Sequence, residues 1–205
     1  MKKIIYILSI AVATSFLASC ETESETSFLQ ISQDLGFVFT GSQGDIEDFL
    51  GSDTYDIMLS LGLDINSGST PLNLNGIFRA DPYCRAASTD PDSTIGCVLN
   101  PFQISFSNQD NDNLTIDYQA VQFNSDGTVG FQETGSGFIS GDASGDFTVI
   151  VRATSGDGSV NATAFSGKVT FEGIVGYQDI FVQDIDTDNQ QGALFNDEDG
   201  LAERQ

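Results

Sequence analysis

The chain has 205 residues, with seven Lys and Arg against thirty Asp and Glu, so its formal net charge is −23, and it contains neither His nor Trp. This length suits one compact domain rather than several. The acidity argues against a nucleic-acid partner, because phosphate backbones repel such a surface. The absence of His excludes Ser-His-Asp and Cys-His catalysis and every His-ligated metal site, and we expect no cofactor.

The N-terminus has the features of a secretion signal. Lys2 and Lys3 precede an apolar run over residues 4–18, which is shorter than the roughly 20 residues of a spanning helix. The run ends in Leu17-Ala18-Ser19-Cys20, which resembles the lipobox of bacterial lipoproteins. That resemblance implies cleavage before Cys20 and its acylation, and more than one lipid chain gives a stable membrane anchor. The alternative is an ordinary secretory signal with an incidental cysteine.

An acidic segment follows the cysteine. Glu21-Thr22-Glu23-Ser24-Glu25 resembles the export signal that sends lipoproteins of Bacteroidota to the outer face of the outer membrane. The alternative is a plain polar tether, disordered because it has nothing to bury. We therefore expect a signal peptide over 1–19, a tether over 20–27 and a single domain over 28–205. The expected location is the outer membrane, facing outward, with the lipid anchor as the contact to the membrane.

Residues 45–63 form the one stretch with helical periodicity, with apolar side chains recurring at intervals of three and four. Ser52 or Asp53 can cap the N-terminus, and Gly62 can take the left-handed position at the end. Residues 45–50 can form a short turn that stops at Gly51. We expect one short N-terminal helix here.

Cys84 and Cys97 are the only pair left for a disulfide once Cys20 is acylated in an oxidising compartment. The bond would close a polar loop of about 14 residues and stabilise the fold by roughly 3 kcal/mol. A redox pair is the alternative, but the Cys-x-x-Cys spacing is missing. Within the loop, Asp92-Ser93-Thr94 matches the short acceptor pattern for O-glycosylation in Bacteroidota, which makes Ser93 a candidate site.

From residue 74 onward, apolar and polar side chains alternate with a period of two, which is typical of antiparallel strands with one buried face. Gly-, Asn- and Asp-rich turns separate the segments. Nine strands in sequence-adjacent hairpins favour an all-β antiparallel meander that closes into a barrel over a sandwich. The apolar phase shifts after Tyr118, which predicts a bulge near Gln119-Ala120. The expected strands span 74–79, 102–107, 114–119, 121–123, 128–132, 137–139, 147–153, 165–171 and 177–183.

Three segments in order carry a family resemblance. Residues 71–78 (PLNLNGIF), 164–174 (AFSGKVTFEGI) and 197–203 (DEDGLAE) resemble the "PPNIEGTY", "ISGTVTxxGI" and "KDGDGLA" segments of an uncharacterised Bacteroidota outer-membrane lipoprotein family. The resemblance implies a lipocalin-like β-barrel of about eight to ten strands on a lipid anchor. It carries over no catalytic or binding residue.

Nine phenylalanines in the predicted strands and turns allow two interpretations. They can line a cavity for a small apolar molecule, or they can fill a solid core, because barrels of about eight strands are near the size that side chains alone fill. Arg79 and Arg152 stand out because cations are few; the alternation puts Arg152 on a polar face, as an exposed partner for acids. The phenylalanines are Phe102, Phe106, Phe123, Phe131, Phe138, Phe147, Phe165, Phe171 and Phe181.

Asp184, Asp186 and Asp188 have the spacing that opens a calcium loop. Asn189 stands where that loop needs Gly, and Phe195 where it needs the bidentate Glu. The cluster therefore predicts at most a loose cation site, and the alternative is a solvated acidic C-terminal tail after the last strand.

These observations favour a non-enzymatic surface lipoprotein that binds a small apolar ligand or an outer-membrane protein partner. The alternative is a structural or accessory subunit of an outer-membrane complex, with a filled barrel. A remote alternative is a glycoside hydrolase that uses two carboxylates across a cleft. A chain with thirty acidic residues contains some such pair by chance, so a pair of carboxylates in the sequence is no evidence for this activity.

Overall fold

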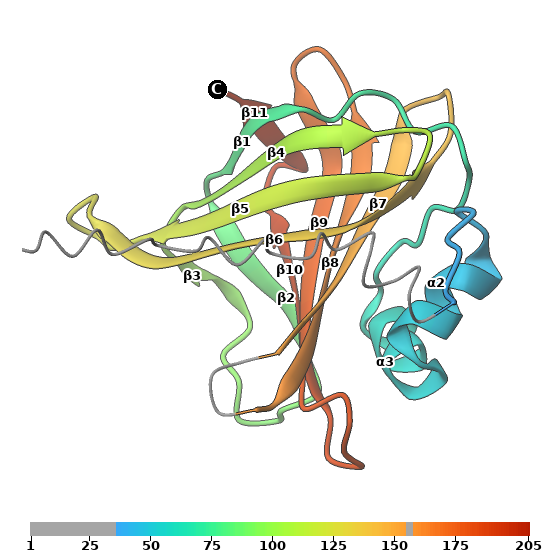
Figure 1. Ribbon diagram of the computed structural model, residues 1–205. Helices are drawn as coiled ribbons and strands as arrows, with labels where there is room; N and C mark the ends of the chain where they lie inside the picture. Colours follow the sequence, from blue (N-terminus) through green and yellow to red (C-terminus); the bar gives the residue numbers. More distant parts are fainter. Residues whose placement is uncertain (1–35, 155–157) are drawn as a thin grey trace, which may run out of the picture.

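The computed structural model describes residues 36–154 and 158–205 and shows a β-barrel with two short helices on its outside (Figure 1). The expected signal peptide, the tether and Cys20 lie outside the described residues. Within the described part of the chain, no helix combines the length and apolar character needed to cross a membrane.

Eight antiparallel strands close the barrel, which confirms the predicted all-β antiparallel fold. The short last strand makes the closure, because it pairs with the first strand through Phe78 and Arg204 and with β9 through Val175 and Leu201. The eight are β1 (Gly76–Ala80), β4 (Phe102–Asp110), β5 (Thr115–Phe123), β6 (Val129–Gly141), β7 (Asp146–Thr154), β8 (Val160–Val169), β9 (Gly173–Gln183) and β11 (Leu201–Arg204).

The second half of β9 carries a side sheet that the sequence did not predict. There β9 pairs with β10 (Gln191–Asp197), which pairs with β2 (Tyr83–Ser88), which pairs with β3 (Gly96–Leu99). The expectation of an acidic tail after the last strand is wrong, because β10 and β11 occupy that region. Strand β10 shows no alternation of apolar and polar residues because both of its faces are covered. Leu194 belongs to the core under the helices, and Phe195 packs against the barrel interior.

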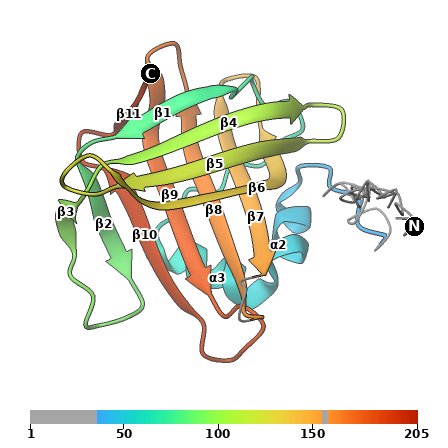
Figure 2. The ribbon, with the colours of Figure 1, turned by 60° about the vertical axis from the view of Figure 1, so that its left-hand side comes forward.

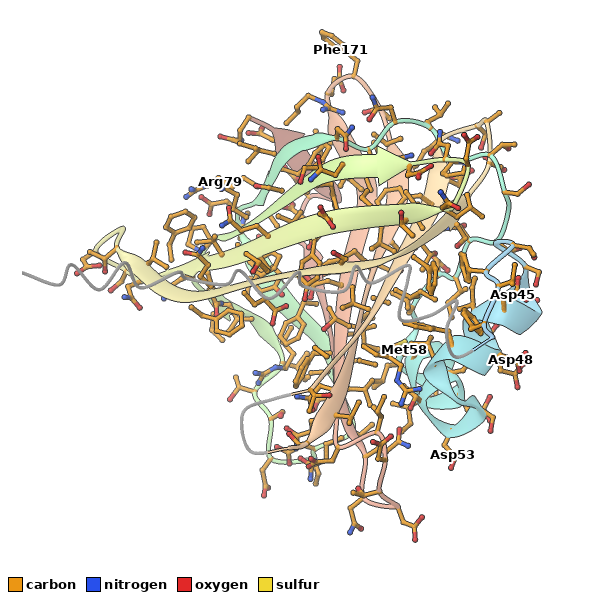
Figure 3. The ribbon with its side chains drawn as sticks, viewed as in Figure 1. Asp45, Asp48, Asp53, Met58, Arg79 and Phe171 are labelled. Carbon is orange, nitrogen blue, oxygen red and sulfur yellow. A yellow bond between two sulfur atoms is a disulfide. The ribbon has the colours of Figure 1, made fainter. Side chains whose placement is uncertain are left out.

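Two apolar cores lie on opposite sides of the barrel wall. One fills the barrel and includes Phe106, Phe147 and Phe165, all nearly inaccessible to solvent. The other lies between the outer face of β7–β10 and the two helices, which cover that face (Figure 2). Phe138 belongs to this outer core. Met58 points toward the strands, whereas the helix residues Asp45, Asp48 and Asp53 point away (Figure 3).

The helical segment is two helices, α2 (Gln43–Leu50) and α3 (Ser52–Leu61), rather than one. Gly51, at φ 84°, breaks the run between them. Helix α2 begins with a capping box, in which the Ser42 hydroxyl accepts from the Asp45 amide and the Asp45 side chain accepts in return. Gly51 also occupies the N-cap of α3, where we expected Ser52 or Asp53. Gly62 ends α3 in the predicted left-handed conformation.

Two details of the strand prediction are wrong. Residues 114–123 pair without a register shift at Gln119-Ala120, because Ala120 continues the inward series of Tyr118 while Val121 is an apolar residue on the outer face. The phase change therefore marks an apolar outer position and not a bulge. Phe171 lies beyond β8 in the turn to β9, with its side chain 95% exposed (Figure 3).

Candidate functional site

The barrel is filled at one end and opens at the other. Strand β6 pairs with β5 along almost its whole length but with β7 only over residues 138–141, so residues 129–137 diverge from β7 (Figure 1). Gly137 sits where the strands separate. A Cβ atom there would lie 2.3 Å from the carbonyl oxygen of Ile150, so only glycine allows this approach.

A pocket of about 320 Å³ occupies the open end, between the β4–β6 sheet and the β8–β10–β2–β3 sheet. Half of its lining residues are aromatic. Its lining residues are Tyr83, Arg85, Leu99, Phe102, Gln122, Phe131, Glu133, Thr163, Phe165, Asp179, Phe181 and Phe195.

The phenylalanines inside the barrel divide between those that fill the core and those that line the pocket. Phe106 and Phe147 fill the closed end. Phe131 and Phe181 line the pocket and stay 50% and 38% exposed. Phe123 lines a neighbouring surface depression next to the rim.

Asp179 is the central polar group of the pocket. Its side chain is 4% exposed and accepts hydrogen bonds from the hydroxyls of Tyr83, at 2.9 and 3.0 Å, and Tyr177, at 2.8 Å. Burial raises the pKa of Asp179 to about 7, because the loss of hydration outweighs the two hydroxyl contacts, which favour the charged form. The group therefore changes charge near neutral pH.

Glu133 is a second carboxyl of the lining and comes from β6. It is half-buried, and the Tyr118 hydroxyl lies 3.4 Å from its Oε1. Burial raises the pKa of Glu133, and its charge in turn raises the pKa of Asp179. Neither carboxyl belongs to an ion pair among the described residues; the three pairs found there are Arg79–Asp81, Arg152–Asp186 and Lys168–Asp146.

Stacked aromatic rings form one wall. The Tyr83 ring lies between those of Phe102 and Phe195, with centroids 4.8 and 5.3 Å away. The Arg85 guanidinium carbon lies 5.5 Å from the Phe195 centroid, a cation–π distance, and its Nη1 donates to the Thr94 carbonyl at 3.3 Å. The Arg85 Nε is buried and has no hydrogen-bond partner.

The predicted disulfide Cys84–Cys97 is confirmed, with an S–S distance of 1.95 Å. It joins β2 to β3. Tyr83 and Arg85 flank one of its cysteines and contribute to the pocket, so the bond holds a wall of the site in place. Ser93, the candidate glycosylation site, lies in the turn between β2 and β3, where its hydroxyl donates to Asp90 at 3.0 Å.

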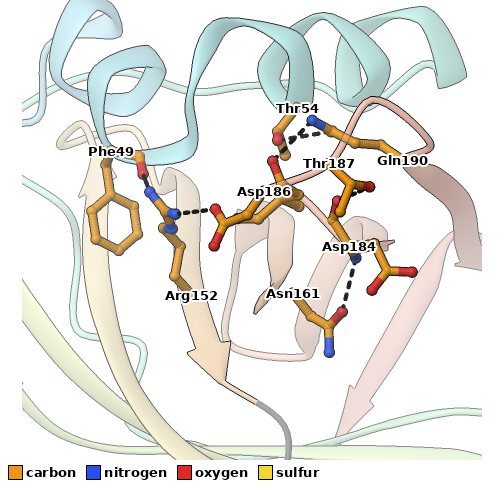
Figure 4. Close-up of polar contacts among 9 residues, drawn as sticks. Phe49, Thr54, Arg152, Asn161, Asp184, Asp186, Thr187 and Gln190 are labelled. Atoms are coloured by element: carbon orange, nitrogen blue, oxygen red, sulfur yellow. Dashed lines mark hydrogen bonds and ion pairs between the residues drawn. The ribbon is translucent and has the colours of Figure 1, made fainter. Parts of the chain in front are cut away.

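The predicted cation cluster does not form. Asp184, Asp186 and Asp188 all lie within the described residues, and no group of three or more metal-binding side chains exists in that part of the chain. Asp186 instead pairs with Arg152 at 3.2 Å, and Arg152 also donates to the Phe49 carbonyl (Figure 4). Arg152 is thus an exposed partner of an acid, as its place on the polar phase of the strand predicted. Arg79 is likewise engaged, with Asp81.

Comparison of this chain with protein-family models, with curated proteins and with solved structures gives no match. The assignment of the site therefore depends on its geometry. Sequence reasoning did not single out Asp179, Glu133 or Arg85. The feature of the sequence that could have indicated the site is the position of Asp179. It is a carboxylate on the inward-facing side of a predicted strand, between Tyr177 and Phe181.

Proposed function

We propose that this protein is a lipid-anchored outer-membrane lipoprotein whose barrel binds a small, largely apolar ligand at its open end. The pocket is the observation that supports ligand binding. It has aromatic walls, a few convergent polar groups and a volume of about 320 Å³, which lies within the range of about 300–1,000 Å³ of small-molecule sites. Residues 1–27 and the family resemblance alone support the anchor and the location. The role that we propose for the protein is non-enzymatic.

A protein partner at the same opening is the second candidate, and it matches the accessory-subunit alternative. Val98, Val129 and Phe131 are 68%, 54% and 50% exposed, and Val98 and Phe131 line the same rim depression. The position of Asp179 favours a small ligand, because a carboxyl that is 4% exposed behind aromatic rings is out of reach of a flat protein surface.

The two carboxyls of the pocket are the observation that favours a glycoside hydrolase. That chemistry needs one carboxyl kept protonated and a second kept ionised, so the two environments must move the pKa values apart. Here burial raises the pKa of both Glu133 and Asp179, so neither environment holds its carboxyl in the ionised form. The pair therefore fits binding better than hydrolysis, and we expect no release of nitrophenol from nitrophenyl glycosides.

Titration with N-phenylnaphthylamine, a neutral dye that fluoresces in apolar surroundings, tests ligand binding. We expect saturable binding to the wild type. Thr163→Trp should abolish it, because Thr163 lines the pocket and indole would fill the space. Thr134→Trp is the matched control, since Thr134 is an exposed threonine on the outer face of β6. Equal dye binding by both variants, or no binding by the wild type, would refute the proposal.

A further inference from the structure

The polar groups of the pocket indicate which charge its ligand carries. This inference rests on the proposed function, the binding of a small ligand. Glu133 and Asp179 both face the pocket, and within the described chain neither has a cationic partner within ion-pair distance. Carboxyls taken out of water without a counter-charge are costly to ionise. A ligand that brings a positive charge removes this cost, whereas a ligand that brings a negative charge adds to it.

The aromatic wall selects in the same direction. The faces of aromatic rings carry negative potential and attract cations. The stacking covers both faces of Tyr83, so the rings with area free for a ligand are those of Phe131 and Phe181, which line the pocket and are 50% and 38% exposed. Arg85 already places a guanidinium over one face of Phe195, so this wall accommodates a cation in the protein itself.

Arg85 is the one cationic side chain in the lining, and it is the group that would attract an anion. Its guanidinium is engaged, however, with the Thr94 carbonyl and the Phe195 ring. Its Nε is buried and has no hydrogen-bond partner. Around the pocket, the formal charge of −23 draws cations toward the protein and repels anions, more strongly at low salt.

We infer that the pocket takes organic cations, in which an ammonium group is carried on an apolar or aromatic body, in preference to anions of the same shape. The aromatic walls hold the body, and the Glu133 and Asp179 carboxyls receive the ammonium group. A fatty-acid carboxylate, the other common ligand of apolar cavities, is disfavoured by the same two residues.

Displacement of the bound neutral dye by two matched compounds tests this inference on the full chain. Phenylbutylammonium and phenylbutanoate have the same length and the same ring and differ in the sign of their charge. At neutral pH and low salt, we expect the ammonium compound to displace the dye at a concentration about tenfold lower than the carboxylate. Added salt should narrow the difference.

Two variants locate the effect. Glu133→Gln should reduce the preference for the ammonium compound over the carboxylate about fivefold, with displacement by each compound referred to the dye affinity measured for the variant itself. Glu172→Gln removes the same charge from an exposed position in the β8–β9 turn and should leave both this preference and the dye affinity unchanged.

The outcomes separate the inference from the proposed function. If the dye binds and the carboxylate displaces it as well as the ammonium compound does, the inference is wrong and ligand binding stands. If Glu133→Gln and Glu172→Gln behave alike, the selectivity belongs to the overall charge and the assignment to the pocket carboxyls is wrong. If the dye does not bind to the wild type, both proposals fail.

Discussion

Replacing Asp179 by Asn should flatten the dependence of stability on pH. The pKa of this carboxyl rises from its ordinary 3.8 to about 7 in the folded chain. Between these values the folded protein keeps a proton that the unfolded chain releases, so the free energy of unfolding falls as pH rises through this window. The difference of about three pKa units corresponds to about 4 kcal/mol. Asn stays neutral, and its side-chain oxygen can still accept a hydrogen bond from Tyr83 or Tyr177.

Urea unfolding followed by circular dichroism measures this effect, with wild type and variant compared at about pH 4.5, 6 and 8. Between pH 4.5 and pH 8 the wild type should lose about 3 kcal/mol more than Asp179→Asn, because the assay covers about 2.5 units of the pKa difference. Burial also raises the pKa of Asp197, to about 6, and this adds a slope in the same direction, but that slope is common to both proteins. Asp188→Asn, at an exposed carboxylate, controls for the change in net charge. Parallel profiles for wild type and Asp179→Asn would refute the argument.

Three further predictions concern stability. Gly137→Ala should destabilise the fold by several kcal/mol in urea unfolding, because the new Cβ would lie 2.3 Å from a backbone oxygen. In contrast, Gly44→Ala in α2 would place its Cβ 3.9 Å from the nearest atom, the Ser42 hydroxyl oxygen, and should stabilise the fold by about 0.5–1 kcal/mol. Met58→Ala should lower the free energy of unfolding by about 2–5 kcal/mol, because Met58 lies on the buried face of α3 and is 0% exposed. Leu59→Ala, at a position that is 43% exposed, should lower it far less. Similar losses for the two variants would contradict the outer core. Cys84→Ser should lower the free energy of unfolding by about 3 kcal/mol. It should also weaken dye binding at temperatures where the protein stays folded. Unchanged dye affinity at those temperatures would show that the disulfide does not support the pocket wall.

The sequence predicted what depends on one-sided burial. Strand β4 alternates clearly because one face lies in the barrel core and the other is more exposed. The disulfide followed from the pairing of the two remaining cysteines. Strand β10 was missed because both of its faces are covered, so Leu194 and Phe195 stand side by side without a period of two.

The site was harder to predict because it depends on where strands separate. No local pattern reports that β6 leaves β7 after four residue pairs, and the pocket lies at the end where the two strands have separated. The acids posed a related difficulty. With thirty in the chain, the one that matters differs from the rest only by its inward phase in a strand, whereas Asp184, Asp186 and Asp188 attracted attention through their spacing and do not come together.

The most direct test of the central claim is to locate the bound ligand by NMR. Titration of the ¹⁵N-labelled protein with phenylbutylammonium should produce saturable amide shifts at the pocket lining, including Phe131, Thr163, Phe181 and Phe195. The helix face around Asp48 and the β8–β9 turn at Phe171 should not shift. Shifts spread over the outer surface, or none at all, would contradict the account of a barrel that is filled at one end and binds a ligand at the other.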